Sequence, residues 1–227
     1  MKKRSRRYQA VVNALGKQQS HSITEAIELV KKHSKEKFDA SVEVHMRLGI
    51  DPKQTDQSFR TTVRMPHGTG KKLRIAAFVS PAKEHEAKAA GAELVGGEEL
   101  VKLIKQTEKV DFDIAVAEPA IMKMLAPIAK ILGTKGKMPS PKTGTVTSSI
   151  AETIGDIAAG RVDLKSDENG NVHQIIGKVS FDPQKLVENF EALLAGVRAA
   201  KPKGAQQEYI KQITVASTMG PGLRIAL

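Results

Sequence analysis

The feature that most constrains the fold is a strict alternation of apolar and polar side chains over residues 41–50. The apolar set is Val42, Val44, Met46, Leu48 and Ile50, and the polar set is Ser41, Glu43, His45, Arg47 and Gly49. A period of two over this length predicts a β-strand with one buried face and one face toward water. The polar face has the chemistry to bind a polar polymer, but an ordinary solvated strand face would show the same pattern.

The net charge points to the kind of partner. The 227 residues carry a formal charge of +11, and most of the excess lies in residues 1–66. A chain this basic is most simply explained by a polyanionic partner, usually a nucleic acid. Aromatic residues make up only 4% of the chain, with no tryptophan, which disfavours a platform for stacked single-stranded bases. Recognition of a folded nucleic acid fits better, and a nonspecific basic nucleic-acid binder is the alternative.

Several classes of protein are excluded or disfavoured. The chain has no cysteine, which excludes disulfides, thiol catalysis and thiolate zinc sites. None of its six histidines has the spacing that places two metal ligands on one helix face. No stretch approaches the roughly 20 apolar residues that cross a bilayer, and the basic N-terminus lacks the apolar core of a signal peptide. We therefore expect a cytoplasmic protein that is not an enzyme, with no catalytic residues, metal, cofactor or membrane partner.

The two ends of the chain share one style of secondary structure. The expected helices are 6–16, 22–34 and 183–202, and the expected strands are 38–50, 60–65, 161–165, 172–181 and 209–215. Ser22 and Glu25 form a capping-box pattern at the start of the second helix. Asn169 and Gly170 predict a hairpin turn between two of the strands. These ends together indicate an α+β domain with an antiparallel sheet and helices.

The middle of the chain alternates buried strands with helices. The expected strands are 73–79, 92–95 and 112–116, and the expected helices are 81–90, 98–106 and 121–132. This alternation is typical of a parallel α/β unit. We therefore predict an outer α+β domain built from residues 1–66 plus 161–227, with an α/β domain of residues 67–160 inserted into it.

Three loops are candidate sites. Residues 133–145 lie in a segment, 119–151, that has five lysines and no acid, which suits contact with a phosphate backbone. A mononucleotide-binding loop, and hence an enzyme, or a plain surface loop are the alternatives. Residues 66–72 superficially resemble a phosphate loop, but they lack its glycine spacing and precede a strand, so we interpret them as a connection between domains. The turn at 214–222 becomes a site only if it lies beside residues 38–43.

Six segments carry a family resemblance. They are 38–45, 48–52, 66–71, 91–99, 112–113 and 218–221. In this order, and over essentially the whole chain, they resemble the bacterial large-subunit ribosomal protein L-one family, which forms part of the mobile stalk beside the tRNA exit site. The resemblance implies the same two-domain layout, with a Rossmann-like inserted domain, and a ribosome-bound protein that is a monomer when free.

The resemblance also implies partners. Members bind a folded site in large-subunit ribosomal RNA, contact the exit-site tRNA and assist release of deacylated tRNA. They commonly repress their own operon by binding a mimic of the ribosomal site in the messenger RNA. The RNA-contacting residues carried over from the family are Lys37, Phe38, Ser41, Glu43, Thr218, Met219 and Gly220, with His173 and Lys178 as less specific matches. A carboxylate such as that of Glu43 can accept from a 2′-hydroxyl or a base amino group.

The loop at 132–142 departs from the family pattern. Thr134 and Lys135 stand where the family usually has proline and arginine, and Lys137 adds a charge. The loss of proline loosens the loop, and the loss of arginine removes a bidentate donor. Lys135, Lys137 and Lys142 are therefore predicted only as a secondary contact to RNA or tRNA.

Overall fold

The computed structural model describes residues 5–15, 20–54, 57–202, 204–205 and 208–226, and it divides into two compact units. The first unit contains Met1–Gly70 and Val162–Leu227, and the second contains Lys71–Arg161. Within the described residues, none of the helices has the length and apolar character needed to span a bilayer. Each unit has its own sheet and its own hydrophobic core.

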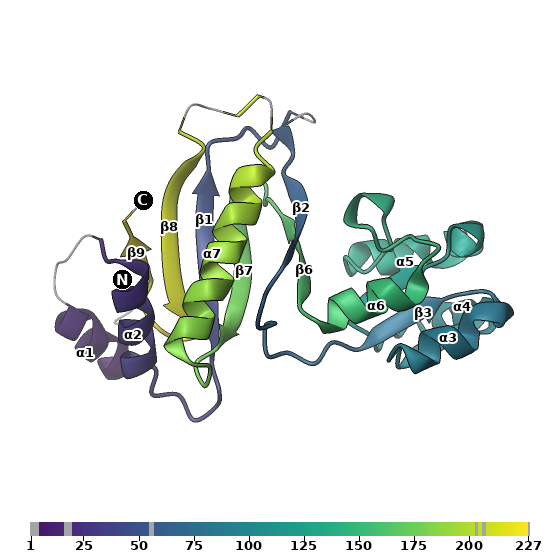
Figure 1. Cartoon of the computed structure of the whole chain (residues 1–227), viewed down its shortest axis with the longest axis horizontal. Helices are drawn as coiled ribbons and strands as arrows, with labels where there is room; N and C mark the ends of the chain where they lie inside the picture. Colours follow the sequence, from purple (N-terminus) through teal and green to yellow (C-terminus); the bar gives the residue numbers. More distant parts are fainter. Residues whose placement is uncertain (1–4, 16–19, 55–56, 203, 206–207, 227) are drawn as a thin grey trace. The chain divides into compact units, whose positions relative to one another are not determined.

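A four-stranded antiparallel sheet forms the centre of the first unit, with the strand order β7-β1-β8-β9 (Figure 1). The strands are β1 (Ser41–Leu48), β7 (Asn171–Lys178), β8 (Ile210–Ser217) and β9 (Leu223–Ile225). The alternation in β1 is confirmed, because its four apolar side chains are at most 3% exposed while its other face carries Glu43, His45 and the exposed Arg47. Strands from both ends of the chain therefore share one sheet, as the fold class predicts.

Two helices pack on the apolar face of this sheet. α2 (Ile23–His33) contacts α7, β8 and β9, and α7 (Pro183–Ala199) also contacts β7 and β2. Their apolar side chains form one cluster with those of β1. The predicted capping box is present: the Ser22 hydroxyl accepts from the amide of Glu25, and the Glu25 carboxylate accepts from the amide of Ser22. The remaining helix, α1 (Arg6–Leu15), lies beside α2 (Figure 1).

The predicted hairpin at residues 161–181 is wrong in its pairing. β6 (Arg161–Lys165) pairs with β2 (Arg60–Arg64) in a separate two-stranded sheet, and Ser166–Val172 is an isolated bridge toward β7. The turn itself exists, with Gly170 at a φ of 77°. The Asp167 carboxylate holds it by accepting from the backbone amide of Asn169 and from the backbone and side-chain amides of Asn171. Because the turn is held by a side chain, it does not require a ladder between the two strands.

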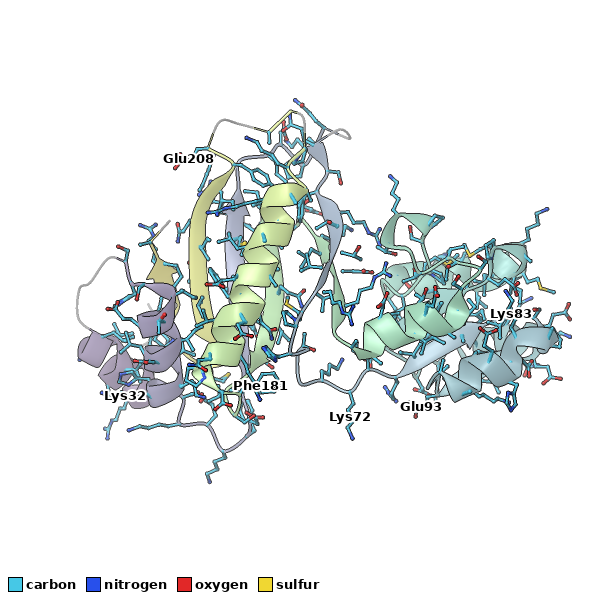
Figure 2. All side chains as sticks on the ribbon, viewed as in Figure 1. Lys32, Lys72, Lys83, Glu93, Phe181 and Glu208 are labelled. Atoms are coloured by element: carbon cyan, nitrogen blue, oxygen red, sulfur yellow. The ribbon has the colours of Figure 1, made fainter. Side chains whose placement is uncertain are left out.

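The segment that connects the units is fastened to α7 before it leaves the first unit. Asn189 is fully buried; its side-chain oxygen accepts from the amide of His67 (3.1 Å), and its amide donates to the carbonyls of Gly68 (2.9 Å) and Ile176 (2.7 Å). Phe181, labelled in Figure 2, closes against Gly70. Residues 67–70 are thus held at both ends by hydrogen bonding and packing within the first unit.

The second unit is a parallel α/β structure, as predicted. Its sheet has the order β4-β3-β5, with β3 (Ile75–Phe78) in the middle, β4 (Leu94–Gly96) and β5 (Ile114–Ala117). All four residues of β3 are buried, because alternate side chains enter the two clusters on opposite faces. The helices are α3 (Glu84–Ala89), α4 (Glu98–Thr107), α5 (Ala129–Thr134) and α6 (Ile150–Ala158).

Two expectations for this unit fail. The helix predicted over 121–132 is broken into 3₁₀ segments at Pro119–Lys123 and Ala126–Ile128 before α5 begins. Pro127 explains the break, since a proline inside a helix lacks the amide donor and clashes with the preceding turn. The other is an omission: α6 was not predicted, although its isoleucines recur at a helical spacing.

A pair of mid-helix glycines provides a test of the packing. An added Cβ at Gly196 in α7 would lie 2.3 Å from Val63 Cγ2, whereas the same atom at Gly155 in α6 would meet nothing within 4 Å. We expect Gly155→Ala to raise stability by about 0.5–1 kcal/mol and Gly196→Ala to lower it by roughly 1–3 kcal/mol. Urea denaturation followed by hydrogen exchange in each unit measures both changes. Stabilisation by both substitutions would contradict the close packing of α7 on β2.

The turn at Asp167 predicts a response to acid. Burial raises the pKa of Asp167, but hydrogen bonds from Asn171, Asn169 and His173 outweigh it and lower the pKa to about 2. A carboxylate with a depressed pKa adds stability that is complete above its ordinary value and is lost as the pH falls through the folded value. The stability difference between the native chain and Asp167→Ala should be constant from about pH 5 to 7 and shrink between about pH 4 and 2. Urea denaturation over a pH series measures it, and a difference independent of pH would contradict this role.

Candidate nucleic-acid interface

One end of the sheet brings together residues that are far apart in the chain. Ser41, at the start of β1, and Thr218, after the end of β8, are joined by three hydrogen bonds. The Thr218 hydroxyl accepts from the Ser41 amide (3.0 Å) and donates to the Ser41 carbonyl (3.3 Å), and the Thr218 amide donates to the same carbonyl (3.1 Å). The condition for a site at residues 214–222, that it lie beside residues 38–43, is therefore met.

Lys178, at the end of β7, reaches the same place from the other side of β1. Its Nζ donates to the Ser41 hydroxyl (3.0 Å) and lies 3.5 Å from the carbonyl oxygen of Asp39. The Asp39 carboxylate in turn accepts from the amide and the hydroxyl of Ser180 (3.1 and 2.8 Å). The ends of β7, β1 and β8 thus lie together at one end of the sheet, and side chains bond them to each other.

Two large apolar side chains project from this end of the sheet. Phe38 and Met219 are each 56% exposed. The other exposed large apolar residues of the described chain are Val12 in α1 and Leu103 and Met124 in the second unit. Exposed apolar groups beside Lys37 and Lys178 suit a ligand with both charged and apolar surfaces, such as nucleic acid.

Gly220 packs closely against Ser217 in the turn. A Cβ at this position would lie 2.3 Å from the Ser217 hydroxyl, and the Gly220 amide donates to the Ser217 carbonyl (3.0 Å). The turn therefore folds tightly back on the last residue of β8. A side chain at position 220 would require the Ser217 hydroxyl to move.

The polar face of the sheet continues from this end as a row of titratable groups. The Nδ1 atoms of His45 and His173 lie 2.8 Å apart, and the two rings meet edge to face. His45 Nε2 is 3.9 Å from the Glu43 carboxylate, and His173 Nε2 is 3.5 Å from that of Asp167. A distance of 2.8 Å between two ring nitrogens requires that one carries the shared proton and the other accepts it.

An open cavity of about 170 Å³ lies over this row. Its lining residues are His45, Met46, Arg47, Asn171, His173, Gln212 and Thr214. His173 was predicted as a contact, Thr214 lies in the candidate turn, and His45 and Arg47 lie on the predicted polar face, whereas Asn171 and Gln212 were not predicted. The sequence signal that could have found Gln212 and Thr214 is the alternation of polar and apolar residues at positions 212–215 in β8. Arg224, on β9, donates to the Gln212 side chain (2.8 Å) and adds a second guanidinium to the same face.

The three predicted loop lysines belong to the second unit, and two of them are turned toward their own backbone. Lys135 Nζ donates to the Glu108 carbonyl (3.2 Å) at the end of α4. Lys137 donates to the Phe112 carbonyl, and its Nζ lies 5.7 Å from the centre of the Phe112 ring. Lys142 follows Ser140 in a short 3₁₀ turn and is exposed.

Comparison with known proteins identifies the family. The ribosomal protein L1p/L10e family matches residues 30–221 of this chain. The chain is 46% identical over 223 residues to the large ribosomal subunit protein uL1 of Thermobifida fusca, covering 98% of this chain and 94% of that protein. It is 41% identical over 227 residues to the protein of the same name from Fervidobacterium nodosum, covering 100% of this chain and 97% of that protein.

The chain belongs to the ribosomal protein L1p/L10e family. This membership confirms the predicted resemblance and the prediction of a structural, non-enzymatic protein. The carboxyl end of the parallel sheet is where α/β folds often bind ligands. There Glu118 accepts a hydrogen bond from the Ser80 amide (3.2 Å) and forms an ion pair with Lys83 (3.2 Å). Hydrogen bonding to Ser80, and to a smaller extent to Lys83, lowers the pKa of Glu118.

The described residues contain no cluster of side chains suited to binding a metal ion. There, no group of three or more histidine, cysteine, aspartate or glutamate side chains is arranged to hold a metal ion. His45, His173 and their two neighbouring carboxylates are therefore best described as a hydrogen-bonded row on the polar face of the sheet.

The row predicts how His45 titrates. Burial lowers the pKa of His45 below 6.5 and the nearby His173 lowers it further, while Glu43 raises it. A neutral His45 therefore adds stability that is present above about pH 6.5 and is lost on acidification. In NMR titration, Glu43→Gln should move the His45 midpoint to lower pH, and His173→Ala should move it to higher pH. A rise on Glu43→Gln would contradict the arrangement.

Proposed function

We propose that this ribosomal protein binds a folded site of large-subunit ribosomal RNA, in the mobile stalk, through the sheet end of the first unit. The observation that carries the proposal is the bonding of Ser41 to Thr218, because it joins two predicted contact segments from opposite ends of the chain. We call the following set the sheet-end surface: Lys37, Phe38, Ser41, Glu43, Lys178, Thr218, Met219 and Gly220; His173, which pairs with His45, is a further predicted contact along the polar face. The relatives are named as proteins of the large ribosomal subunit, which supports ribosomal RNA as the partner.

Each part of the sheet-end surface has a chemical role in this proposal. The exposed Lys37 supplies charge for phosphates, and Lys178 supplies charge while it orients Ser41. Phe38 and Met219 offer apolar area to unstacked bases and sugars of a folded RNA. Glu43 is an acceptor for 2′-hydroxyl and base amino groups, which would distinguish RNA from DNA. Gly220 lets the turn fold closely against Ser217, which fixes the backbone beside Met219.

The two compact units support separate roles. We propose that the outer domain, residues 1–66 plus 161–227, supplies the specific affinity for ribosomal RNA. The inserted domain, residues 67–160, would contact the departing exit-site tRNA and assist its release, with Lys135 and Lys142 as its exposed loop lysines. The same sheet-end surface would bind a mimic of the ribosomal site in the messenger RNA of its own operon and repress its translation. The free protein would be a cytoplasmic monomer that becomes ribosome-bound.

The first test is binding to a ribosomal RNA stalk fragment and to an unrelated duplex of equal length, over a series of salt concentrations. Specific binding predicts a preference for the stalk fragment that survives at high salt, where nonspecific electrostatic binding falls steeply. Phe38→Ala should weaken stalk binding by about 1–3 kcal/mol, or roughly 5- to 150-fold, if the ring stacks on a base. Thr218→Ala should also weaken it, because the turn loses the two hydroxyl bonds to Ser41 and keeps only the backbone bond.

Leu103→Ala is the matched control, since Leu103 is as exposed as Phe38 but lies in the second unit. It should leave stalk binding unchanged. Equal affinity for both RNAs, or equal losses for Phe38→Ala and Leu103→Ala, would defeat the proposed site and leave a nonspecific basic protein.

A further inference from the structure

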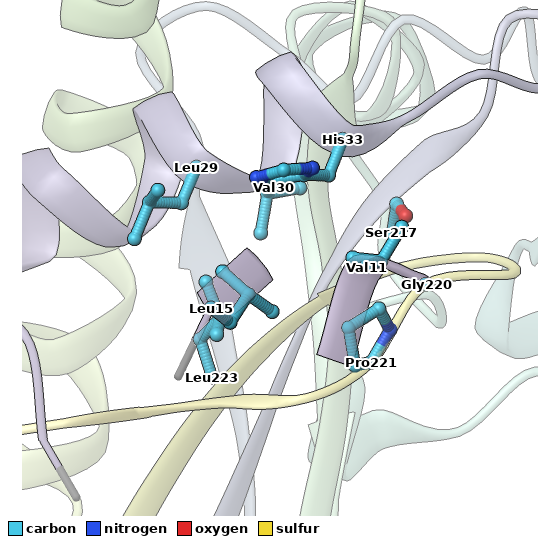
Figure 3. Close-up of a pocket in the computed structure, with 9 residues that line it drawn as sticks. All are labelled: Val11, Leu15, Leu29, Val30, His33, Ser217, Gly220, Pro221 and Leu223. Atoms are coloured by element: carbon cyan, nitrogen blue, oxygen red, sulfur yellow. The ribbon is translucent and has the colours of Figure 1, made fainter. Parts of the chain in front are cut away.

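The N-terminal helix α1 packs against the turn that follows β8, on the side that faces α2. α1 contributes Val11 and Leu15 to this seam, and α2 contributes Leu29, Val30 and His33 (Figure 3). The opposite wall is formed by Ser217, Gly220, Pro221 and Leu223. The cavity that remains has a volume of about 10 Å³, which is no more than the space of one water molecule. The seam is therefore closely packed and has no room for an organic ligand.

The docking of α1 depends on one side of the helix. Val11 is 8% exposed, whereas its neighbour Val12 is 40% exposed. A helix of this length is marginal in water on its own, so its stability must come largely from packing in the seam. Since Gly220 and Pro221 line that seam, the order of α1 and the order of the turn depend on each other.

The turn is thus held from two sides. On the side of β1, Thr218 is bonded to Ser41, and on the side of the helices, Gly220 and Pro221 pack against the seam. Met219 lies between these two anchors and projects outward, 56% exposed. A ligand that touches Met219 meets a side chain whose backbone is fixed on both sides.

We propose that Val11 is a positioning residue for RNA binding, because docking of α1 fixes the turn that presents Met219. This inference rests on the proposed function of the sheet-end surface. It requires no contact between α1 and the RNA. Fixing the turn before binding reduces the ordering cost that the RNA contacts would otherwise have to offset.

The chain offers a matched pair of variants for the test. Val11→Asp places a carboxylate in the seam, and Val12→Asp places the same charge one residue further along the same helix, on its exposed side. We expect Val11→Asp to weaken binding of the stalk fragment by about tenfold and Val12→Asp to change it by about twofold at most. Val11→Ile should bind as the native chain does, because it keeps the apolar contact.

Amide hydrogen exchange supplies the readout that a general loss of stability would not give. In the full-length Val11→Asp chain, exchange should accelerate at the amides of Gly220 and Leu223 while the amides of β1 and β7 stay protected. In the native chain, bound stalk RNA should slow exchange in α1. If Val11→Asp also accelerates exchange at the β1 amides, the milder pair Val11→Thr and Val12→Thr is used instead. Val11→Thr should then weaken binding more than Val12→Thr does.

Equal losses of affinity for both aspartate variants would overturn the proposal, since charge and not docking would then explain them. Native affinity in Val11→Asp with a loosened turn would also overturn it. Failure of the proposed function is distinguishable, because it appears as a native chain with no preference for the stalk fragment. Faster exchange at Gly220 in Val11→Asp alone would still support the coupling of α1 to the turn.

Discussion

The structure of the first unit depends on the double pairing of β1. This strand lies between β7 on one side and β8 on the other, and both neighbours come from the last third of the chain. Its apolar face anchors the core shared with α2 and α7, and its polar face carries Glu43, His45 and Arg47. The same pairing that buries the core therefore also assembles the sheet-end surface.

Much of this could be predicted from local patterns. The alternation along β1, the capping box at Ser22 and the fully apolar β3 each reflect a regular side-chain period or a short-range hydrogen bond, which a single sequence records directly. The parallel unit followed from the order of strands and helices. The meeting of Ser41 with Thr218 was stated only as a condition, because pairing between distant strands leaves no local signal.

The features that could not be predicted from the sequence were missed for physical reasons as well. The break at Pro127 was overlooked because apolar residues on both sides keep a helical period. The pairing of β6 with β2 depends on a competition between strands that no turn motif decides. The contact between His45 and His173 needs the register of β1 with β7, in which the two residues are direct partners. Lys135 and Lys137 were predicted as a secondary contact to RNA or tRNA, and each donates to a backbone carbonyl of its own unit, which depends on the folded positions of Glu108 and Phe112.

The bond between Ser41 and Thr218 also sets the order of events during synthesis. Strand β1 leaves the ribosome early, but it has neither partner strand until residues 171–217 have been made. A nascent chain that has only reached the second unit can fold that unit, since all its strands and helices are contiguous. It has no sheet-end surface at that stage. Binding of RNA through the proposed sheet-end surface therefore requires that nearly the whole chain has been translated.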